Sequence, residues 1–154
     1  MFKASLTFVD GAFFCGIMTD ILSAPPADWE SLERFSFGDN PALADELLEL
    51  VLRGIKTGTC WAAIDGQQTV TGQLNVVCDG RDQPRAIIRT CSLEKRRYCD
   101  VSADFAAKEG EGDRSLAYWR REHERYFRRL NQFSETMELW CEEFVVVFVF
   151  PETR

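Results

Sequence analysis

The last stretch of the chain places the strongest constraint on the fold. Residues 137–150 read MELWCEEFVVVFVF, and from residue 144 onward every side chain is apolar. Successive side chains of a strand point to opposite faces of a sheet, so this strand is apolar on both of its faces. A strand of this kind has to be covered on both sides. We therefore expect it to lie in the middle of a sheet.

A helix is predicted by punctuation at both of its ends. In FGDNPALADELLELVLRG, Asn40 is a good N-cap residue, and Pro41 suits the first helical position. Apolar residues then recur every three or four positions as far as residue 52. Gly54 fits a left-handed position just past the helix end. The helix is therefore expected to run from about residue 41 to about residue 52.

The remaining elements alternate between strand and helix patterns. Short β-rich stretches predict three strands, with the turn DGRDQP (79–84) between the last two; these strands are CWAAI (60–64), GQLNVVCD (72–79) and PRAIIRTCSL (84–93). Helical patterns occur in ADWESLERF (27–35), at the start of SADFAAKEGEGD (102–113) and in RSLAYWRREHERYFRRL (114–130). We expect an α+β fold in which a small, closed and mostly antiparallel sheet is flanked by helices.

Length and composition indicate one domain of ordinary globular type. The chain has 154 residues, of which 45% are hydrophobic. Residues 1–26 are expected to be a leader, either disordered or upstream of a second start at Met18, and residues 27–154 a single domain. Six widely spaced cysteines with no CxxC pair and a single histidine argue against a zinc knuckle. We expect buried, reduced cysteines, no membrane span and a cytoplasmic location rather than a disulfide-bonded secreted protein.

The charge distribution limits the kinds of partner. The net charge is −7, and residues 1–50 account for all of it, because residues 51–154 carry sixteen acids and sixteen bases. A field of this sign disfavours non-specific binding to duplex DNA, but local basic patches remain compatible with a short or single-stranded ligand. Five arginines within residues 120–129 form one such patch, although interleaved glutamates make an ion-paired solvent face an equal reading. The oligomeric state is not indicated.

The stretch LRGIKTGTCW (52–61) places a lysine among small and hydroxylated residues. Lys56 directly follows a helix end, where it could simply contact exposed carbonyls, or, partly desolvated, act as a proton acceptor or a point charge. Thr59 supplies a hydroxyl three residues later, as a nucleophile or to satisfy local backbone. Cys60 has no histidine near it in sequence, so we expect a core cysteine.

Two separated stretches and the closing strand resemble the ASCH-domain family. The resemblance covers about residues 30–150 and rests on G-x-K-x-x-T, here Gly54, Lys56 and Thr59, followed by EGEGD, Ser, YW, His and Phe in AAKEGEGDRSLAYWRREHERYF (106–127). It implies a PUA-like β-barrel and an RNA or nucleoside ligand. Some members resemble ribonucleases of single-stranded RNA, which would need a divalent metal. A shorter relative type removes the acetyl group of N4-acetylcytidine without a metal.

The resemblance also implies roles for individual residues. The lysine, threonine and glutamate of the amidohydrolase type correspond to Lys56, Thr59 and Glu109, with Glu111 as an alternative because the loop differs in length. Lys56 would be base or electrostatic clamp, and Thr59 nucleophile or water-orienter. A non-catalytic module that binds RNA or a nucleotide in the same pocket is the alternative function.

Further ligand-binding candidates come from the same stretches. No metal ligand is assigned, although Glu109, Glu111 and Asp113 could supply oxygen donors. Aromatic residues could stack a base or fill the core. His123 could bind a ligand or simply be a helix residue with one hydrogen bond. Arg89, inside a predicted strand, would favour a more negative ligand. These candidates are Gly54, Thr57, Trp61, Arg89, Ser115, Trp119, Arg120 and His123.

Overall fold

The computed structural model describes residues 21–152, which form one five-stranded sheet with three helices. The strands lie in the order β1-β3-β4-β5-β2. Only the β1–β3 pair is parallel. The strands are β1 (Arg34–Phe35), β2 (Gly58–Ala62), β3 (Leu74–Cys78), β4 (Pro84–Arg97) and β5 (Glu138–Val149). Residues 1–20 of the expected leader lie outside the described residues.

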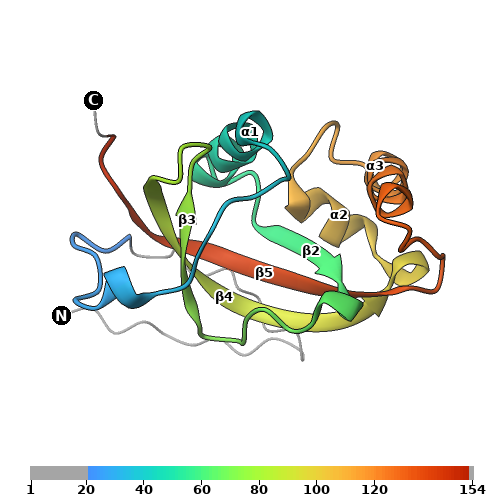
Figure 1. Cartoon of the computed structure of the whole chain (residues 1–154), viewed down its shortest axis with the longest axis horizontal. Coiled ribbons are helices and arrows are strands. Elements are labelled where there is room, and N and C mark those ends of the chain that lie inside the picture. The colour runs from blue at the N-terminus through green and yellow to red at the C-terminus, as the bar shows by residue number, and fades with distance from the viewer. Residues whose placement is uncertain (1–20, 153–154) are drawn as a thin grey trace.

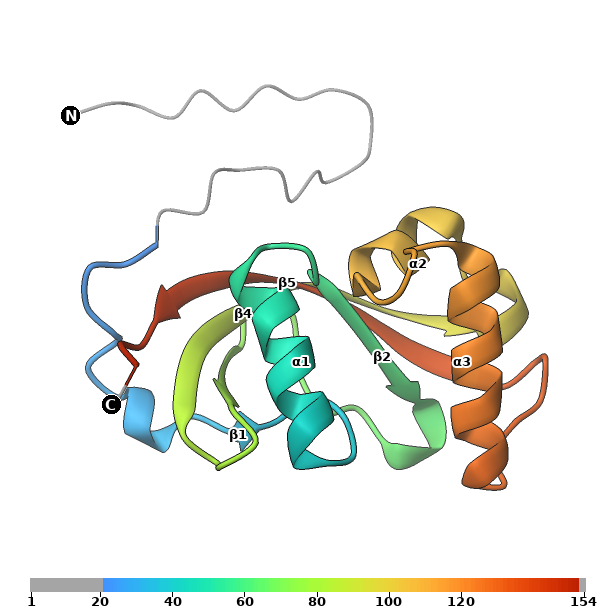
Figure 2. The same ribbon diagram turned by 90° about the horizontal axis from the view of Figure 1, so that it is seen from above.

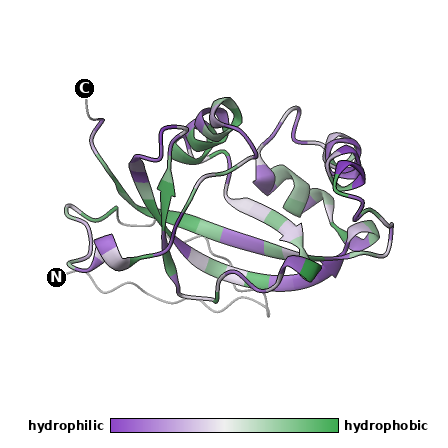
Figure 3. Ribbon diagram, viewed as in Figure 1, coloured by the Kyte–Doolittle hydropathy of each residue, from purple (hydrophilic) through white to green (hydrophobic). Residues whose placement is uncertain are grey.

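The closing strand occupies the interior of the sheet, as its apolar pattern predicts. β5 pairs with β4 on one side and with β2 on the other, and it crosses the whole molecule in Figure 1. Its two ends are hydrophobic, whereas its middle is hydrophilic (Figure 3). The hydrophilic middle of β5 consists of Glu142 and Glu143. Acids in the middle of a central strand require partners, and the partners of Glu142 belong to the site described below.

Three α-helices gather along one side of β5 (Figure 1). Seen from above in Figure 2, α1 and α3 flank β2. A side chain caps each helix: Asn40, as expected from the sequence, and also Ser102 and Ser115 accept hydrogen bonds from backbone N–H groups of the first turn. The helices are α1 (Pro41–Leu52), α2 (Ala103–Glu109) and α3 (Leu116–Arg129).

The amphipathic helix expected over residues 27–35 is wrong. Trp29–Ser31 make a single 3-10 turn, and Arg34–Phe35 form the edge strand β1. Val76 donates its backbone N–H to the carbonyl of Glu33, so β3 draws this segment into the sheet. The other strands and helices lie close to where the sequence predicts them, with two differences. β4 extends to residue 97, and the strand expected over residues 60–64 is shifted to 58–62, with Ala63–Asp65 in a 3-10 turn.

The closed barrel expected from the sequence is also wrong, because the sheet is open. β1 and β2 are its two edges, and no ladder joins them within the described residues. β1 has only two residues and pairs with β3 alone, so it offers too little backbone to close the sheet. The side chains of the two edges instead line a common cavity, to which Arg34 and Phe35 contribute from β1 and Thr59, Cys60 and Trp61 from β2. A pocket therefore lies where a closed barrel would have joined the two edges.

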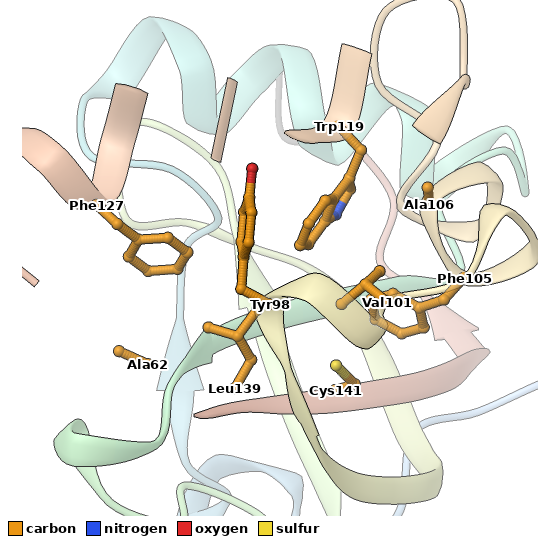
Figure 4. Close-up of a cluster of buried hydrophobic side chains, with 9 residues drawn as sticks. All are labelled: Ala62, Tyr98, Val101, Phe105, Ala106, Trp119, Phe127, Leu139 and Cys141. Atoms are coloured by element: carbon orange, nitrogen blue, oxygen red, sulfur yellow. The ribbon is translucent and has the colours of Figure 1, made fainter. Parts of the chain in front are cut away.

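Two apolar clusters hold the helices against the sheet. The cluster beneath α2 and α3 includes Tyr98, Trp119 and Phe127, and Figure 4 shows Tyr98 beside Trp119, with ring centroids 5.4 Å apart. The cluster beneath α1 includes Leu47, Val51 and Phe144. β2 runs between α1 and α3 (Figure 2).

Further expectations concern one turn, the cysteines, membrane spans and the leader. Residues 79–84 form the turn between β3 and β4, with Asp79 donating its N–H to the Gln83 carbonyl. Within the described range, Cys60, Cys78, Cys99 and Cys141 are free of disulfides, as expected. No helix in residues 21–152 is long and apolar enough to cross a membrane. Of the expected leader, residues 21–26 are described, and the Leu22 N–H donates to the Val147 carbonyl at 2.8 Å.

Candidate functional site

The loop that carries Lys56 is held on three sides. After α1, the backbone N–H groups of Ile55 and Lys56 both donate to the Leu50 carbonyl. The Thr57 N–H donates to the carbonyl of Lys108 in α2 at 2.7 Å, and the Thr57 carbonyl accepts from Phe144 of β5 at 2.9 Å. Because α1, α2 and β5 fix this loop together, the position of the Lys56 side chain is determined by tertiary structure.

Lys56 is a buried cation, with 2% of its surface exposed. Its Nζ donates to the backbone carbonyl of Glu109 and to Oε1 of Glu111, each at 3.3 Å. It also lies 5.3 Å from the ring centroid of Phe37. The carbonyl belongs to the last residue of α2, so a helix C-terminus does hold Lys56, but it is a helix 53 residues away in sequence and not its own.

Glu109 and Glu111 have different surroundings. The Glu109 carboxylate is buried, and its Oε2 accepts from Trp119 Nε1 at 2.5 Å and contacts His123 Nε2 at 2.9 Å. The thiol of Cys60 also hydrogen-bonds this carboxylate. The Glu111 side chain is 30% exposed and faces Lys56. Glu111 therefore supplies the carboxylate beside the lysine, and Glu109 supplies only a backbone carbonyl.

The Glu109–His123 pair makes stability depend on pH. Burial raises the pKa of Glu109, but His123, Lys56 and Cys60 outweigh burial and hold that pKa below 4.5. Burial lowers the pKa of His123, but Glu109 outweighs it and raises that pKa above 6.5. The Glu109 contribution is present above pH 4.5 and is lost as the pH falls through its folded pKa. The His123 contribution is present below pH 6.5 and is lost as the pH rises through its folded pKa.

His123→Gln is therefore expected to destabilise the protein most between pH 4.5 and pH 6.5, the two unfolded-state values. The stability gap to the wild type should shrink at higher pH, because the wild-type imidazolium is then neutralised. Urea unfolding at about pH 6 and about pH 9 measures this gap. Arg128→Gln, at an exposed position of the same helix, should show no comparable pH dependence. A gap for His123→Gln that widens with pH would contradict the pairing.

A second polar group, missed by the sequence reasoning, surrounds Glu142. The Glu142 carboxyl is 4% exposed and accepts from Thr90 Oγ1 of β4 at 2.7 Å. Thr69 lies 2.9 Å from Thr90, and Asn75 and Gln73 of the following segment continue the network. In sequence, Glu142 looked like one of two ordinary strand acids. The available signal was a pair of acids, Glu142 and Glu143, between apolar residues of a central strand.

The polar residues around Lys56 and those around Glu142 line two adjoining pockets. The first pocket, about 540 Å³, contains Glu142, Asn75 and Trp61. The second, about 320 Å³, contains Lys56 and Glu111 together with side chains of α3. Four residues line both pockets and so form their common wall: Phe37, Gly38, Thr59 and Cys60. Thr59 thus lies between the buried cation and the buried carboxyl, directly opposite Glu142 in the β2–β5 ladder.

The structure brings together only some of the residues that the sequence singled out. Lys56, Thr59, Glu109, Glu111 and His123 line the second pocket, and Trp61 lines the first. Trp119 is buried behind the second pocket, where it binds Glu109. Like Trp119, the other five candidates line neither of these pockets: Gly54, Thr57, Arg89, Ser115 and Arg120.

The five outlying candidates have other contacts. Gly54 ends α1 at φ 71° and Ser115 caps α3. Arg89 and Arg120 are exposed, and Arg120 offers its backbone carbonyl to the Tyr98 hydroxyl at 2.7 Å. Neighbouring arginines of α3 form ion pairs, such as Arg128–Glu124 at 2.7 Å and Arg129–Asp39 at 3.1 Å. The α3 surface therefore has the ion-paired solvent character that the sequence left as one of two readings.

The donors suited to a metal differ from the acidic loop considered from sequence. Asp113 instead accepts the Ser115 N–H at 2.9 Å. Cys60, Glu109 and His123 place one ligand atom each within 4.8 Å of one another. Burial and the neighbouring Glu109 raise the pKa of Cys60 well above 9.0, so the thiol keeps its proton. Cys60 and His123 both contact the Glu109 carboxylate, whose backbone carbonyl accepts from Lys56.

Gly110 is expected to be the most sensitive glycine of the site. It ends α2 at φ 77°, and a Cβ there would lie 2.8 Å from the Ile55 carbonyl oxygen and 3.0 Å from Lys56 Cα. Gly54 has φ 71° and open space around it. Gly54→Ala should lower the free energy of unfolding by about 1–2 kcal/mol, because alanine is strained in the left-handed backbone conformation. Gly110→Ala should lower the free energy of unfolding, measured in urea, by more than this. The added Cβ would push away the loop that bears Lys56. Equal costs would show that this close approach is unimportant.

The fold and the motif together define the family. A family model for the ASCH domain matches residues 33–148, and this chain belongs to that family. A crystal structure of an ASCH domain from Lactobacillus crispatus is 35% identical, with a TM-score of 0.68, and the match covers 78% of this chain and 82% of that one. A crystal structure of a protein from Enterococcus faecalis is 34% identical, with a TM-score of 0.68, covering 80% of this chain and 84% of that one. The comparison with curated proteins found no match.

Proposed function

We propose that this ASCH domain binds a nucleoside in the two adjoining pockets and hydrolyses an amide on its base, as in N4-acetylcytidine. The observation that carries the proposal is Lys56, a cation with 2% exposure that lines a pocket beside a hydroxyl and a carboxylate. Burying a lysine is costly, and a hydrophobic residue of similar size would serve a purely structural role as well or better. RNA recognition by PUA-like folds supports the same class of ligand.

The proposed chemistry uses three side chains around one acyl group. Lys56 holds the acyl oxygen as negative charge develops on it. The hydroxyl of Thr59, or a water that Thr59 orients, attacks the acyl carbon, and Glu111 accepts the proton released. Glu111 passes this proton to the nitrogen as the C–N bond breaks, and the nitrogen leaves as the neutral amino group of cytidine. If water attacks directly, its oxygen becomes the second oxygen of acetate. If Thr59 attacks, a water then hydrolyses the Thr59 ester, which releases acetate and a proton and restores the hydroxyl. Glu109, His123 and Trp119 act as positioning residues behind Lys56.

The proposal is tested with two substrates and a chelator. Wild-type protein is incubated with N4-acetylcytidine or with a short single-stranded RNA, each with and without EDTA. We expect acetate and cytidine from the nucleoside in both conditions, because no step uses a metal. RNA cleavage that EDTA abolishes would replace this proposal with a metal-dependent ribonuclease. Binding of RNA without any product would indicate the non-catalytic module.

Thr59 is the residue that separates a chemical role from a binding role in this pocket. We expect Thr59→Ala to lower kcat/KM for N4-acetylcytidine by roughly 100-fold, and Thr59→Ser to retain most of it, because serine keeps the hydroxyl. Thr57→Ala serves as the control, since Thr57 lines neither pocket. Full activity of Thr59→Ala would remove the hydroxyl from the mechanism.

A further inference from the structure

Glu142 is a buried acid that the proposed hydrolysis does not use. It lies in β5 opposite Thr59 of β2 and opposite Leu93 of β4, with 4% of its surface exposed. It lines the larger pocket, on the far side of the wall shared with the Lys56 pocket. A buried carboxyl without a cation in hydrogen-bond contact is costly, so its place in a pocket suggests a ligand.

The hydrogen bonds behind Glu142 all point toward one of its oxygens. Gln73 Nε2 donates to Asn75 Oδ1 at 3.0 Å, and Asn75 Nδ2 donates to Thr69 Oγ1 at 3.3 Å. Thr90 donates its hydroxyl proton to Glu142 Oε1, so Thr69 must be the donor in the 2.9 Å contact between the two threonines. The chain of donors fixes Oε1 as an acceptor. The proton of a neutral Glu142 therefore belongs on Oε2.

The surroundings favour that neutral form. Burial raises the pKa of Glu142 above 4.5, and the Thr90 hydrogen bond and Lys56 only partly offset it. The other titratable or charged groups that line this pocket are Cys60 of β2, Glu33 and Arg34 at the β1 edge. A neutral carboxyl presents a donor, Oε2–H, directly beside an acceptor, Oε1.

The walls of the pocket suit a flat ring. Trp61 of β2, Phe35 of β1 and Phe37 after β1 all line it. The Trp61 indole is fixed by its Nε1–H, which donates to the Gly66 carbonyl at 2.9 Å. Aromatic side chains stack on nucleobases, and the volume of about 540 Å³ lies within the usual range for small-molecule sites.

We propose that Glu142 binds the hydrogen-bonding edge of a nucleobase that carries an acceptor next to an N–H donor, as cytosine does at its ring nitrogen and exocyclic amino group. Oε2–H donates to the ring nitrogen, Oε1 accepts from the amino group, and Trp61 stacks on the ring. The nucleobase then lies in the larger pocket, and its substituent reaches across Thr59 toward Lys56.

This inference deepens the proposed function, because it says which kind of nucleobase the larger pocket binds. It rests on the proposed function only in placing the substituent of that nucleobase at Lys56. Cytidine has no acetyl group to be hydrolysed, so its binding reports on Glu142 alone. A protein that binds cytidine as described below but never releases acetate would retain this inference and lose the proposed function.

The test is equilibrium binding of cytidine, measured by calorimetry from about pH 5 to about pH 9. For the wild type we expect the dissociation constant to rise toward about tenfold per pH unit above the pKa of Glu142, because only the protonated form binds. Glu142→Gln keeps a donor beside an acceptor, so it should bind at all these pH values without that slope. Glu142→Leu should bind about tenfold or more weakly at low pH.

A neighbouring glutamate provides the matched control. Glu143 contacts Lys108 at 2.9 Å and lines neither pocket, so Glu143→Gln should behave as the wild type. The wild-type pH series needs no variant and so does not depend on the folding of any. Wild-type binding that strengthens with pH, or that Glu142→Gln abolishes while the variant remains folded, would overturn the inference, because the ionised carboxylate would then be the binding form.

Discussion

Lys56→Met is expected to lower kcat/KM for N4-acetylcytidine by roughly 10²–10⁴-fold, the range typical of losing a positioned catalytic group. Methionine has a similar length and no charge, so the acyl oxygen loses the cation that stabilises it. The melting temperature should change little, because Glu111, the acid paired with Lys56, is 30% exposed and is solvated once the cation is gone. Steady-state kinetics and thermal unfolding of the same preparation measure both effects.

Lys108→Met is the control for this experiment. Lys108 lies in α2, its side chain is 43% exposed, and its Nζ pairs with Glu143 rather than with a pocket residue. Its replacement should leave kcat/KM within about twofold of the wild type, as expected for an exposed ion pair. If Lys56→Met kept wild-type activity, the cation would have no part in catalysis, and the pocket would remain only a binding site.

The second large effect separates the two acids near Lys56. Glu109→Ala should lower the free energy of unfolding by about 3–5 kcal/mol, because it leaves His123 and the Trp119 N–H buried without their partner. Glu111→Gln should change stability by less than about 1 kcal/mol, since Glu111 is partly exposed, yet reduce turnover strongly. Urea unfolding and acetate release distinguish these two outcomes.

Glu109→Gln refines this comparison. The amide keeps the size of the acid and an acceptor for the Trp119 N–H, but not the charge opposite His123. We expect a loss of stability between those of Glu111→Gln and Glu109→Ala. If Glu111→Gln retained full turnover while a folded Glu109→Gln lost it, the carboxylate of Glu109 would be the site acid and the roles assigned to the two residues would be exchanged.

Features with a local cause could be predicted from the sequence. The ends of α1 follow from Asn40, Pro41 and Gly54, and the interior place of β5 follows from apolar side chains on both of its faces. Lys56 and Thr59 were also found in this way, because both belong to one short motif. In each case the residues that decide the outcome lie within a few positions of one another.

Features that depend on distant partners could not be predicted. Closure of the sheet required a ladder between β1 and β2, and the sequence does not show that β1 is limited to two residues. The hydrogen-bond partner of Glu142 is Thr90, 52 residues earlier in the chain. Glu111 and Glu109 are two positions apart, and only the geometry at the end of α2 decides that the first offers Lys56 a carboxylate and the second a carbonyl.

The central claim is that the pockets on either side of Thr59 bind a nucleoside. The most direct measurement is an NMR titration of isotope-labelled wild-type protein with cytidine, which reports on every backbone amide at once. We expect shifts to concentrate at residues that line the larger pocket, namely Thr59, Trp61, Asn75 and Glu142. Shifts confined to the exposed arginines of α3, or no shifts at saturating cytidine, would contradict the claim and place any RNA contact outside these pockets.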